Sequence, residues 1–304
     1  MQPNLEQSIM LSLHTNAASL SAQAALGSTN KALSTSLTRL STGYRVNSAM
    51  DDAAGLQIAT RLDAQTRGMA VAQRNTQNGI SMMQTAEGAF GEVTSILQRM
   101  KDLATEAATA SSTTKDQTAM QAEYDSLGKE MANIIKNTSF GGTQLFSNGT
   151  TTTGASGLLS TTSLTFQIGA SAGETMAVDS GTQLTAVATA LGNASGTYTT
   201  PGTPGTELAS TTSANGIITT LNTALDEVGS MRSILGAASN RLDHVFNNLQ
   251  NMSTNTEAAK GRIMDVDYAS ETANMTTKQM LMQAGTSMLK QSNSMSQLAL
   301  SLMQ

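Results

Sequence analysis

Apolar residues recur every three or four positions over long stretches of this chain. Between Met83 and Ala107 the recurrence is unbroken, which is the spacing of a coiled-coil seam. The series consists of Met83, Ala86, Phe90, Val93, Leu97, Met100, Ala104 and Ala107. Proline occurs only at positions 3, 201 and 204, so the sequences on either side of the centre can form long uninterrupted helices.

A second seam lies in the C-terminal half of the chain. We expect two polar residues, Arg232 and Ser239, to interrupt it. Its apolar members are Ile218, Leu221, Leu225, Val228, Leu235, Leu242, Phe246 and Leu249. Two seams of this kind predict helices that pack against each other.

Both ends of the chain are nearly free of charge. Lys31 is the only charged residue between positions 7 and 38, and three charged residues lie between positions 269 and 304. An amphipathic helix normally keeps a charged face for water. The two ends therefore predict helices that are buried against other chains, with apolar stripes at Leu26, Leu33, Leu37 and Leu40, and at Leu281, Ala284, Met288, Met295, Leu298 and Leu302.

The centre of the chain has a different character, because it is rich in Gly, Ser and Thr. Leu164, Phe166 and Ile168 alternate with polar residues, which predicts a short strand, and Met176 and Val178 fit its return strand. The Gly, Thr, Ser and Pro content of residues 197–216 predicts an exposed loop. The predicted fold class is mainly α, a long antiparallel helical bundle or coiled coil built from both termini, with a small central β-hairpin region.

Charge and composition remove several classes of function. The net charge is −5 and no basic cluster occurs, which argues against nucleic-acid binding. The chain has no cysteine, and its two histidines, His14 and His244, have no metal-ligand spacing. We find no nucleophile motif and no glycine-rich phosphate loop, so we predict no enzyme and no cofactor. No apolar run reaches membrane-spanning length, and residues 1–10 lack the features of a cleaved signal peptide.

Two acidic pairs remain to be explained. Asp51 and Asp52 precede one predicted helix, and Asp265 and Asp267 precede another. Carboxylates at such positions accept hydrogen bonds from free backbone N–H groups and suit the helix dipole. We therefore predict capping and not metal binding, because the Gly and distal Glu of a calcium loop are missing.

Four long motifs, two near each end of the chain, are similar to one known family. Residues 40–56 (LSTGYRVNSAMDDAAGL) and 74–89 (RNTQNGISMMQTAEGA) resemble the N-terminal signature of bacterial flagellins. Residues 261–271 (GRIMDVDYASE) and 283–289 (QAGTSML) resemble the C-terminal signature. The resemblance covers residues 11–146 and 214–304.

The resemblance implies a self-assembling subunit of an extracellular helical filament used for motility. Residues 11–45 and 262–304 would be terminal helices that form the inner filament core, with Leu26, Leu33, Leu37, Leu40, Leu281, Met288, Met295, Leu298 and Leu302 in it. Residues 46–180 and 214–261 would form an outer bundle with a β-hairpin, and residues 181–213 a short variable loop. Residues 1–10 would be an N-terminal extension.

The same resemblance implies several partners. They are other copies of the chain, an export chaperone and the type III export apparatus, and the cap and hook-junction proteins. A host Toll-like receptor would recognise a patch at Arg99, Leu103 and Glu123. Export would proceed without a cleaved signal peptide.

One alternative remains open at this point. A hook–filament junction protein of the flagellum shares the terminal helices, but such proteins generally match these signatures less fully. An unrelated secreted coiled-coil protein is disfavoured by residues 51–55 (DDAAG).

Overall fold

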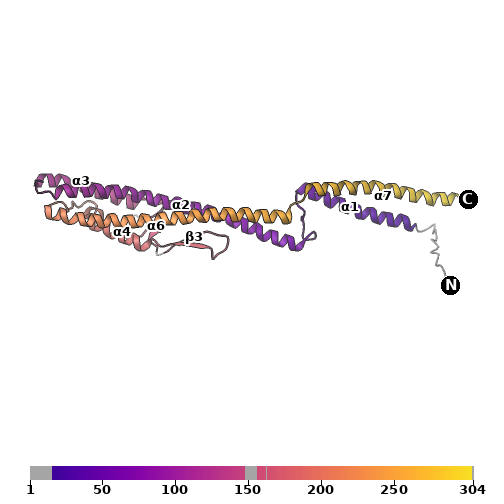
Figure 1. The fold of residues 1–304 in the computed structure, drawn as a ribbon, viewed down its shortest axis with the longest axis horizontal. Helices are drawn as coiled ribbons and strands as arrows, with labels where there is room; N and C mark the ends of the chain where they lie inside the picture. The colour runs from indigo at the N-terminus through magenta and orange to yellow at the C-terminus, as the bar shows by residue number, and fades with distance from the viewer. Residues whose placement is uncertain (1–15, 148–155, 162, 303–304) are drawn as a thin grey trace. The chain divides into compact units, whose positions relative to one another are not determined.

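Long helices dominate this computed structural model, which describes residues 16–147, 156–161 and 163–302, with backbone only from 295 onwards. The predicted N-terminal extension, residues 1–10, lies outside the described residues. Seven α-helices are present in the described part (Figure 1). They are α1 Ala17–Thr42, α2 Ala53–Ala107, α3 Thr114–Asn137, α4 Gly181–Ala194, α5 Gly196–Thr199, α6 Thr211–Met264 and α7 Tyr268–Leu302.

The strands are short and form two separate hairpins. In the first, β1 (Ser139–Phe140) pairs with β2 (Thr143–Gln144) around Gly141 and Gly142, which both have positive φ angles. In the second, β3 (Leu164–Gln167) pairs antiparallel with β4 (Thr175–Val178), and Leu164 lies opposite Val178. The predicted central hairpin and the mainly α fold class are confirmed.

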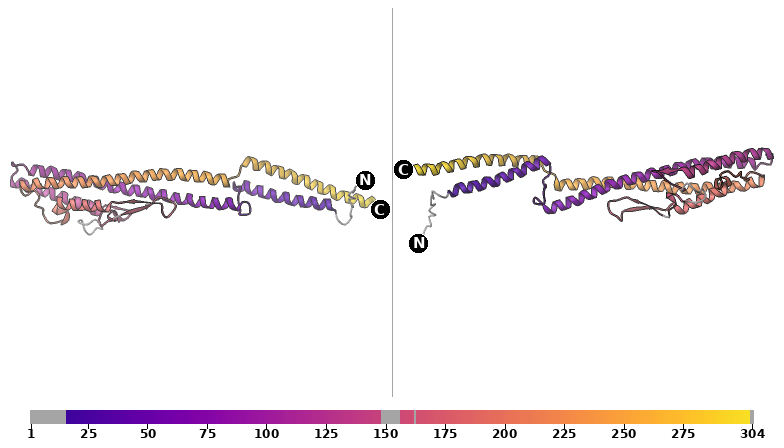
Figure 2. Two further views of the ribbon diagram at one scale, coloured as in Figure 1. Left: turned by 60° about the horizontal axis from the view of Figure 1, so that its bottom comes forward. Right: turned by 180° about the vertical axis from the view of Figure 1, so that it is seen from behind.

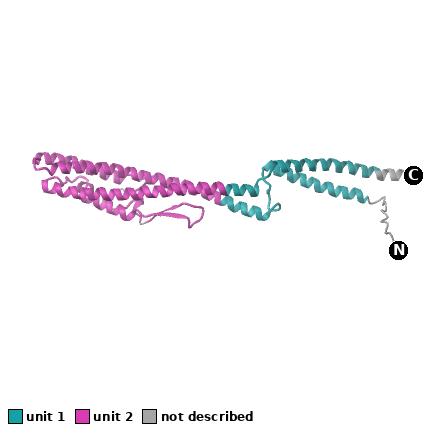
Figure 3. Cartoon of the chain, in the orientation of Figure 1, with its two compact units in different colours: residues 1–64, 256–304 teal, residues 65–255 magenta. Residues whose placement is uncertain are grey.

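The chain divides into two compact units (Figure 3). Unit 1 contains residues 1–64 and 256–304, and unit 2 contains residues 65–255. Unit 2 holds the larger core, in which the predicted α2 seam from Met83 to Ala107 is buried along its whole length. No helix within the described ranges is both long and apolar enough to span a membrane.

The α6 seam is continuous, contrary to the prediction that Arg232 and Ser239 interrupt it. Met231 and Ala238 fill those steps and are buried, whereas Arg232 and Ser239 lie beside the seam, half-buried. Arg232 donates to Glu87 Oε1 from Nη2 at 2.6 Å. The buried series has three–four spacing from Ala214 to Leu242, and half-buried Val245 fills the step to Leu249. Its buried members are Ala214, Ile217, Leu221, Ala224, Val228, Met231, Leu235, Ala238, Leu242 and Leu249.

Residues 181–213 are not the short variable surface loop that the resemblance implied, and part of the loop predicted from composition is buried as well. Leu184, Val187 and Leu191 recur at helical spacing and bury one side of α4 in the core of unit 2. Tyr198 of α5 and Leu208 are also fully buried. The packing of these apolar side chains outweighs the Gly, Thr and Ser content that favours a loop.

A buried polar network joins the 195–208 segment to α3. Asp125 accepts hydrogen bonds from Gln121 Nε2 at 2.7 Å, Thr197 Oγ1 at 3.0 Å and the Gly205 N–H at 3.1 Å. Glu207 accepts from the same Gln121 amide at 2.9 Å and from the Gly196 N–H at 2.7 Å. Since buried carboxylates must be hydrogen-bonded, this network fixes the segment in one place.

Candidate assembly site

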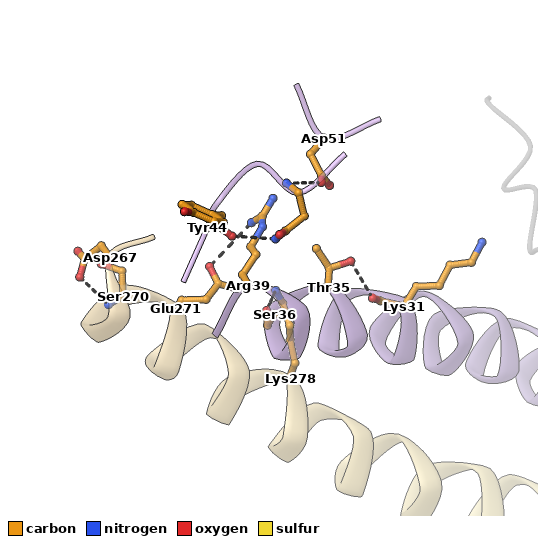
Figure 4. Close-up of polar contacts among 11 residues, drawn as sticks. Lys31, Thr35, Ser36, Arg39, Tyr44, Asp51, Asp267, Ser270, Glu271 and Lys278 are labelled. Atoms are coloured by element: carbon orange, nitrogen blue, oxygen red, sulfur yellow. Dashed lines mark hydrogen bonds and ion pairs between the residues drawn. The ribbon is translucent and has the colours of Figure 1, made fainter. Parts of the chain in front are cut away.

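In unit 1, α1 and α7 lie side by side in every view (Figures 1 and 2). At one end of the pair Asn16 Nδ2 donates to Ser292 Oγ at 3.2 Å, and at the other Arg39 lies beside Glu271. Residues early in α1 therefore face residues late in α7, so the two helices are antiparallel. Figure 4 shows the end of the pair nearest residue 271.

The faces that meet follow a seven-residue repeat. On each helix the half-buried or buried positions recur at alternating steps of three and four residues, the signature of an antiparallel coiled-coil seam. On α1 this series is Ser19, Ala22, Leu26, Thr29, Leu33, Ser36 and Leu40, with half-buried Ala32 and Arg39 beside it. On α7 it is Glu271, Met275, Lys278, Met282, Gly285, Leu289 and Ser292, with half-buried Ser294 beside it.

Two charged residues of α7 lie in this seam, and Arg39 of α1 lies beside it. Lys278 Nζ donates to Ser36 Oγ at 3.1 Å, and Ser36 is only 1% exposed. Arg39 Nη1 lies 3.8 Å from Glu271 Oε2, and Glu271 is 7% exposed. Glu271 Oε1 and Arg39 Nε are buried without a hydrogen-bond partner. The buried charge of Glu271 therefore depends on Arg39, whose side chain is 29% exposed, because a buried charge without compensation is costly.

Sequence reasoning did not single out these residues as a site, although it did register how few charges the ends carry. Two of the three charged residues after position 269, Glu271 and Lys278, lie in the seam. Their separation of seven residues, in a helix otherwise almost free of charge, was the available signal.

The predicted polymer-core residues fall on two different faces. Leu26, Leu33 and Leu40 are half-buried and face the seam. Leu37 is 49% exposed, and on α7 Leu281 is 55% and Met288 68% exposed. The side chains of Met295, Leu298 and Leu302 lie outside the described residues. In the single subunit, α7 thus presents an apolar stripe that α1 does not cover, with Met280 beside it at 58% exposure.

A structured turn joins α1 to α2. Gly43 ends α1 in the left-handed conformation, with φ of 77°, and its N–H donates to the Arg39 carbonyl at 2.9 Å. Asp51 accepts hydrogen bonds from the N–H groups of Asn47 and Ser48, which lower the pKa of its carboxyl group. Asp52 accepts from the Gly55 N–H at 2.8 Å, so it is Asp52 that caps α2.

The same turn is tied to the chain that precedes α7. Tyr44 and Asp265 form an isolated antiparallel bridge, and the Val266 N–H donates to the Gly43 carbonyl at 3.0 Å. Asp267 caps α7 by accepting from the Ser270 hydroxyl and from the Ser270 and Ala269 N–H groups, and these bonds lower its pKa. The predicted capping roles are confirmed for Asp52 and Asp267.

The expected receptor patch lies on unit 2. Arg99 donates from Nη2 to Glu123 Oε1 at 2.7 Å, and both side chains are about half exposed. The hydrogen bond to Glu123 and its charge raise the pKa of Arg99. Leu103 is only 2% exposed and belongs to the core. The ion pair is therefore the part of the patch that another molecule can touch.

Comparison with known proteins gives matches at both ends of the chain. Residues 13–151 match the bacterial flagellin N-terminal helical region, and residues 218–303 match the bacterial flagellin C-terminal helical region. The chain is 35% identical over 377 aligned residues to flagellin A of Vibrio anguillarum, covering 97% of this chain and all of that protein. It is 38% identical over 266 residues to a flagellin of Halalkalibacterium halodurans, covering 87% of this chain and 89% of that protein.

Two solved structures are similar as well. A crystal structure of a Bacillus cereus flagellin is 30% identical in sequence, covers 62% of this chain and 94% of its own, and gives a TM-score of 0.46. The structure of a putative flagellar hook-associated protein from Vibrio parahaemolyticus gives a TM-score of 0.53 at 16% identity, covering 71% of this chain and all of its own. The latter likeness concerns the fold alone.

Proposed function

The chain belongs to the bacterial flagellin family, and from this premise we propose which of its surfaces build the flagellar filament. Like its family, the chain is a structural subunit that polymerises with copies of itself into the extracellular filament of a motile bacterium, and it is not an enzyme. The hook–filament junction alternative is not favoured, since both flagellin regions match over most of the chain.

We propose that α1 and α7 form the inner core of this filament and that residues 46–180 with 214–261 form the outer layer. The observation that carries the proposal is the uncovered apolar stripe of α7, which includes Leu281 and Met288. Large exposed apolar patches on a soluble chain mark interaction sites. Burying one such side chain contributes about 1.5–3 kcal/mol, and a polymer repeats this gain at every subunit. A contact between different surfaces of successive copies, with a rotation that does not close on itself, then gives an open helical polymer and not a ring.

Polymerisation of a double variant, Leu281→Gln with Met288→Gln, tests this assignment. The variant keeps the side-chain volume but removes the apolar character, so it is expected to leave unit 2 folded and to abolish seeded filament growth. The matched control is Met252→Gln, an exposed methionine that lies outside α1 and α7, and its filaments are expected to form normally. Normal filaments from the double variant would refute the core role of this stripe.

The remaining partners follow from family membership. In this proposal a dedicated chaperone holds α7 before export, the type III apparatus exports the chain without a cleaved signal peptide, and growth proceeds between a cap and the hook-junction proteins. The low charge of α7 supports binding by a chaperone, because the apolar surface of this helix must be shielded from water until the subunit assembles. Binding of a C-terminally truncated chain, lacking residues 269–304, to the chaperone would contradict it.

We also propose that a host Toll-like receptor contacts the exposed Arg99–Glu123 pair. Arginine is enriched among the residues that contribute most to binding at protein–protein interfaces. The variant Arg99→Ala should therefore reduce activation of receptor-bearing cells. Glu87→Ala is the matched control, because it breaks a comparable surface ion pair with Arg232 elsewhere in unit 2. Equal signals from both variants would exclude this role of Arg99.

A further inference from the structure

One face of α7 carries a different kind of side chain at each seventh position. In the α1–α7 seam these positions are an acid, a base, a residue without a side chain and a hydroxyl, namely Glu271, Lys278, Gly285 and Ser292. The alternate seam positions, Met275, Met282 and Leu289, are all apolar and nearly interchangeable. The chemical type of the side chain therefore changes from one seven-residue repeat to the next in the first series, whereas it stays apolar in the second.

Three members of this series each have a polar partner on α1 or at its N-cap, Asn16. Glu271 pairs with Arg39 at 3.8 Å, Lys278 donates to Ser36 at 3.1 Å, and Ser292 accepts from Asn16 at 3.2 Å. Gly285 provides space instead of a bond. A Cβ atom built on Gly285 would lie 3.2 Å from Leu26 Cδ1, which is already tighter than an ordinary carbon–carbon contact of about 3.5–4.0 Å.

Sliding the helices by one repeat would break every one of these matches. If Lys278 took the place of Glu271, two positive charges would meet at Arg39, and Ser292 would bring a side chain against Leu26. If α7 slid the other way, Lys278 itself would take the place of Gly285 beneath Leu26. The apolar residues alone would tolerate both shifts, because methionine replaces methionine or leucine with little loss.

We infer that Glu271, Lys278, Gly285 and Ser292 specify the register of α7 on α1. Arg39 is the α1 residue that distinguishes the registers, because it meets Glu271 in the native register and Lys278 in the slipped one. Buried polar residues in a coiled-coil seam lower stability but select one alignment. The polar residues thus lower the stability of the α1–α7 pair but restrict its two helices to one alignment. This inference rests on the proposed role of α1 and α7 in the filament core.

Disulfide trapping in assembled filaments tests the inference. Because the chain has no cysteine of its own, only the introduced pair can form a disulfide. Leu26→Cys with Gly285→Cys reports the native register, and Leu26→Cys with Ser292→Cys reports a slip of seven residues. After mild oxidation, a denaturing gel without reductant separates the cross-linked single chain from cross-linked dimers. In the otherwise unchanged chain the native reporter should form at least about fivefold more intrachain disulfide, a ratio equal to about 1 kcal/mol.

Charge reversal at Arg39 gives the decisive result. In an Arg39→Glu chain the native register opposes two carboxylates, whereas the slipped register pairs the new carboxylate with Lys278, so the ratio of the two reporters should reverse. Adding Glu271→Arg should move the ratio back toward the native register, because it replaces the repulsion in that register by an ion pair. Lys31→Glu, a charge reversal at an exposed position of α1, is the control and should leave the ratio unchanged.

Two results would overturn the inference. Arg39→Glu filaments that keep the native ratio would mean that the backbone bridge between Tyr44 and Asp265 sets the register alone. If Arg39→Glu does not assemble, the double variant decides, and its failure to recover filaments in which the native reporter predominates would equally reject the inference. The core role of α7 is tested separately by filament formation in the Leu281→Gln, Met288→Gln variant, so failure of either idea can be recognised by itself.

Discussion

Replacing Gly68 by alanine tests how closely the β3–β4 hairpin lies on α2. Gly68 is in the interior of α2, and a Cβ atom built there would lie 2.6 Å from Ala170 Cβ and 3.1 Å from Ala170 Cα. Ordinary carbon–carbon contacts are about 3.5–4.0 Å, so the hairpin must move by roughly 1 Å. No rotamer change can relieve the overlap, because the atoms concerned belong to an alanine.

Two opposing effects set the expected magnitude. Overpacking costs about 1–3 kcal/mol, whereas replacing glycine by alanine in a helix interior returns about 1 kcal/mol. The second effect can be measured separately at Gly91 of the same helix, where an added Cβ atom meets nothing within 4 Å. We expect Gly91→Ala to stabilise unit 2 by about 0.5–1 kcal/mol and Gly68→Ala to be less stable than Gly91→Ala by about 1–3 kcal/mol.

Urea unfolding, followed by the near-ultraviolet circular dichroism of tyrosine, measures this difference. The chain has no tryptophan, and Tyr124 and Tyr198 are fully buried in unit 2, so their signal reports on its core. The two alanine variants should differ in transition midpoint and not in slope. If Gly68→Ala is as stable as Gly91→Ala, the hairpin does not lie on α2 as closely as described.

Three further predictions concern other parts of the chain. Thr113→Ala should cost about 1 kcal/mol, measured by thermal unfolding, because Thr113 and Asp116 form a reciprocal capping box at the start of α3. Asp125→Asn should destabilise unit 2 by about 1–3 kcal/mol, since Asp125 accepts three hydrogen bonds in a buried network; an unchanged urea midpoint would exclude that role. The pKa values of Asp51 and Asp267 are lowered in the folded chain, so their contribution to stability is present above the usual pKa of about 4 and is lost as the pH falls through the lowered values. An acid titration of the chain with Asp51→Asn and Asp267→Asn should therefore lack this component.

The sequence predicted those elements whose apolar spacing was unambiguous. The α2 seam from Met83 to Ala107 and the hairpin around Phe166 and Met176 follow directly from periods of three to four and of two. The predicted interruption of the α6 seam at Arg232 and Ser239 is wrong because the neighbouring residues Met231 and Ala238 occupy the seam at these two steps. Alanine carries a weak apolar signal, although it packs well in a tight seam.

The face of α7 that meets α1 was harder to predict. Apolar residues occupy two adjacent faces of this helix, and the stripe with Leu281 and Met288 is the more hydrophobic of the two. The face that packs on α1 contains Glu271 and Lys278, which a hydropathy pattern assigns to solvent. Only the positions of Arg39 and Ser36 on the opposite helix show why these charges belong in the seam, and a single sequence does not contain that information.

The exposed residues 201–204 bear on the use of this chain as a carrier for foreign peptides. They lie between buried Tyr198 and the Gly205 N–H that donates to Asp125, so both ends of this short segment are anchored. Loop tips of this kind accept added residues at small cost, since closing a longer loop costs only about 0.6 kcal/mol for each doubling of its length. An epitope inserted between Gly202 and Thr203 would be displayed once per subunit while the anchors on both sides stay in place.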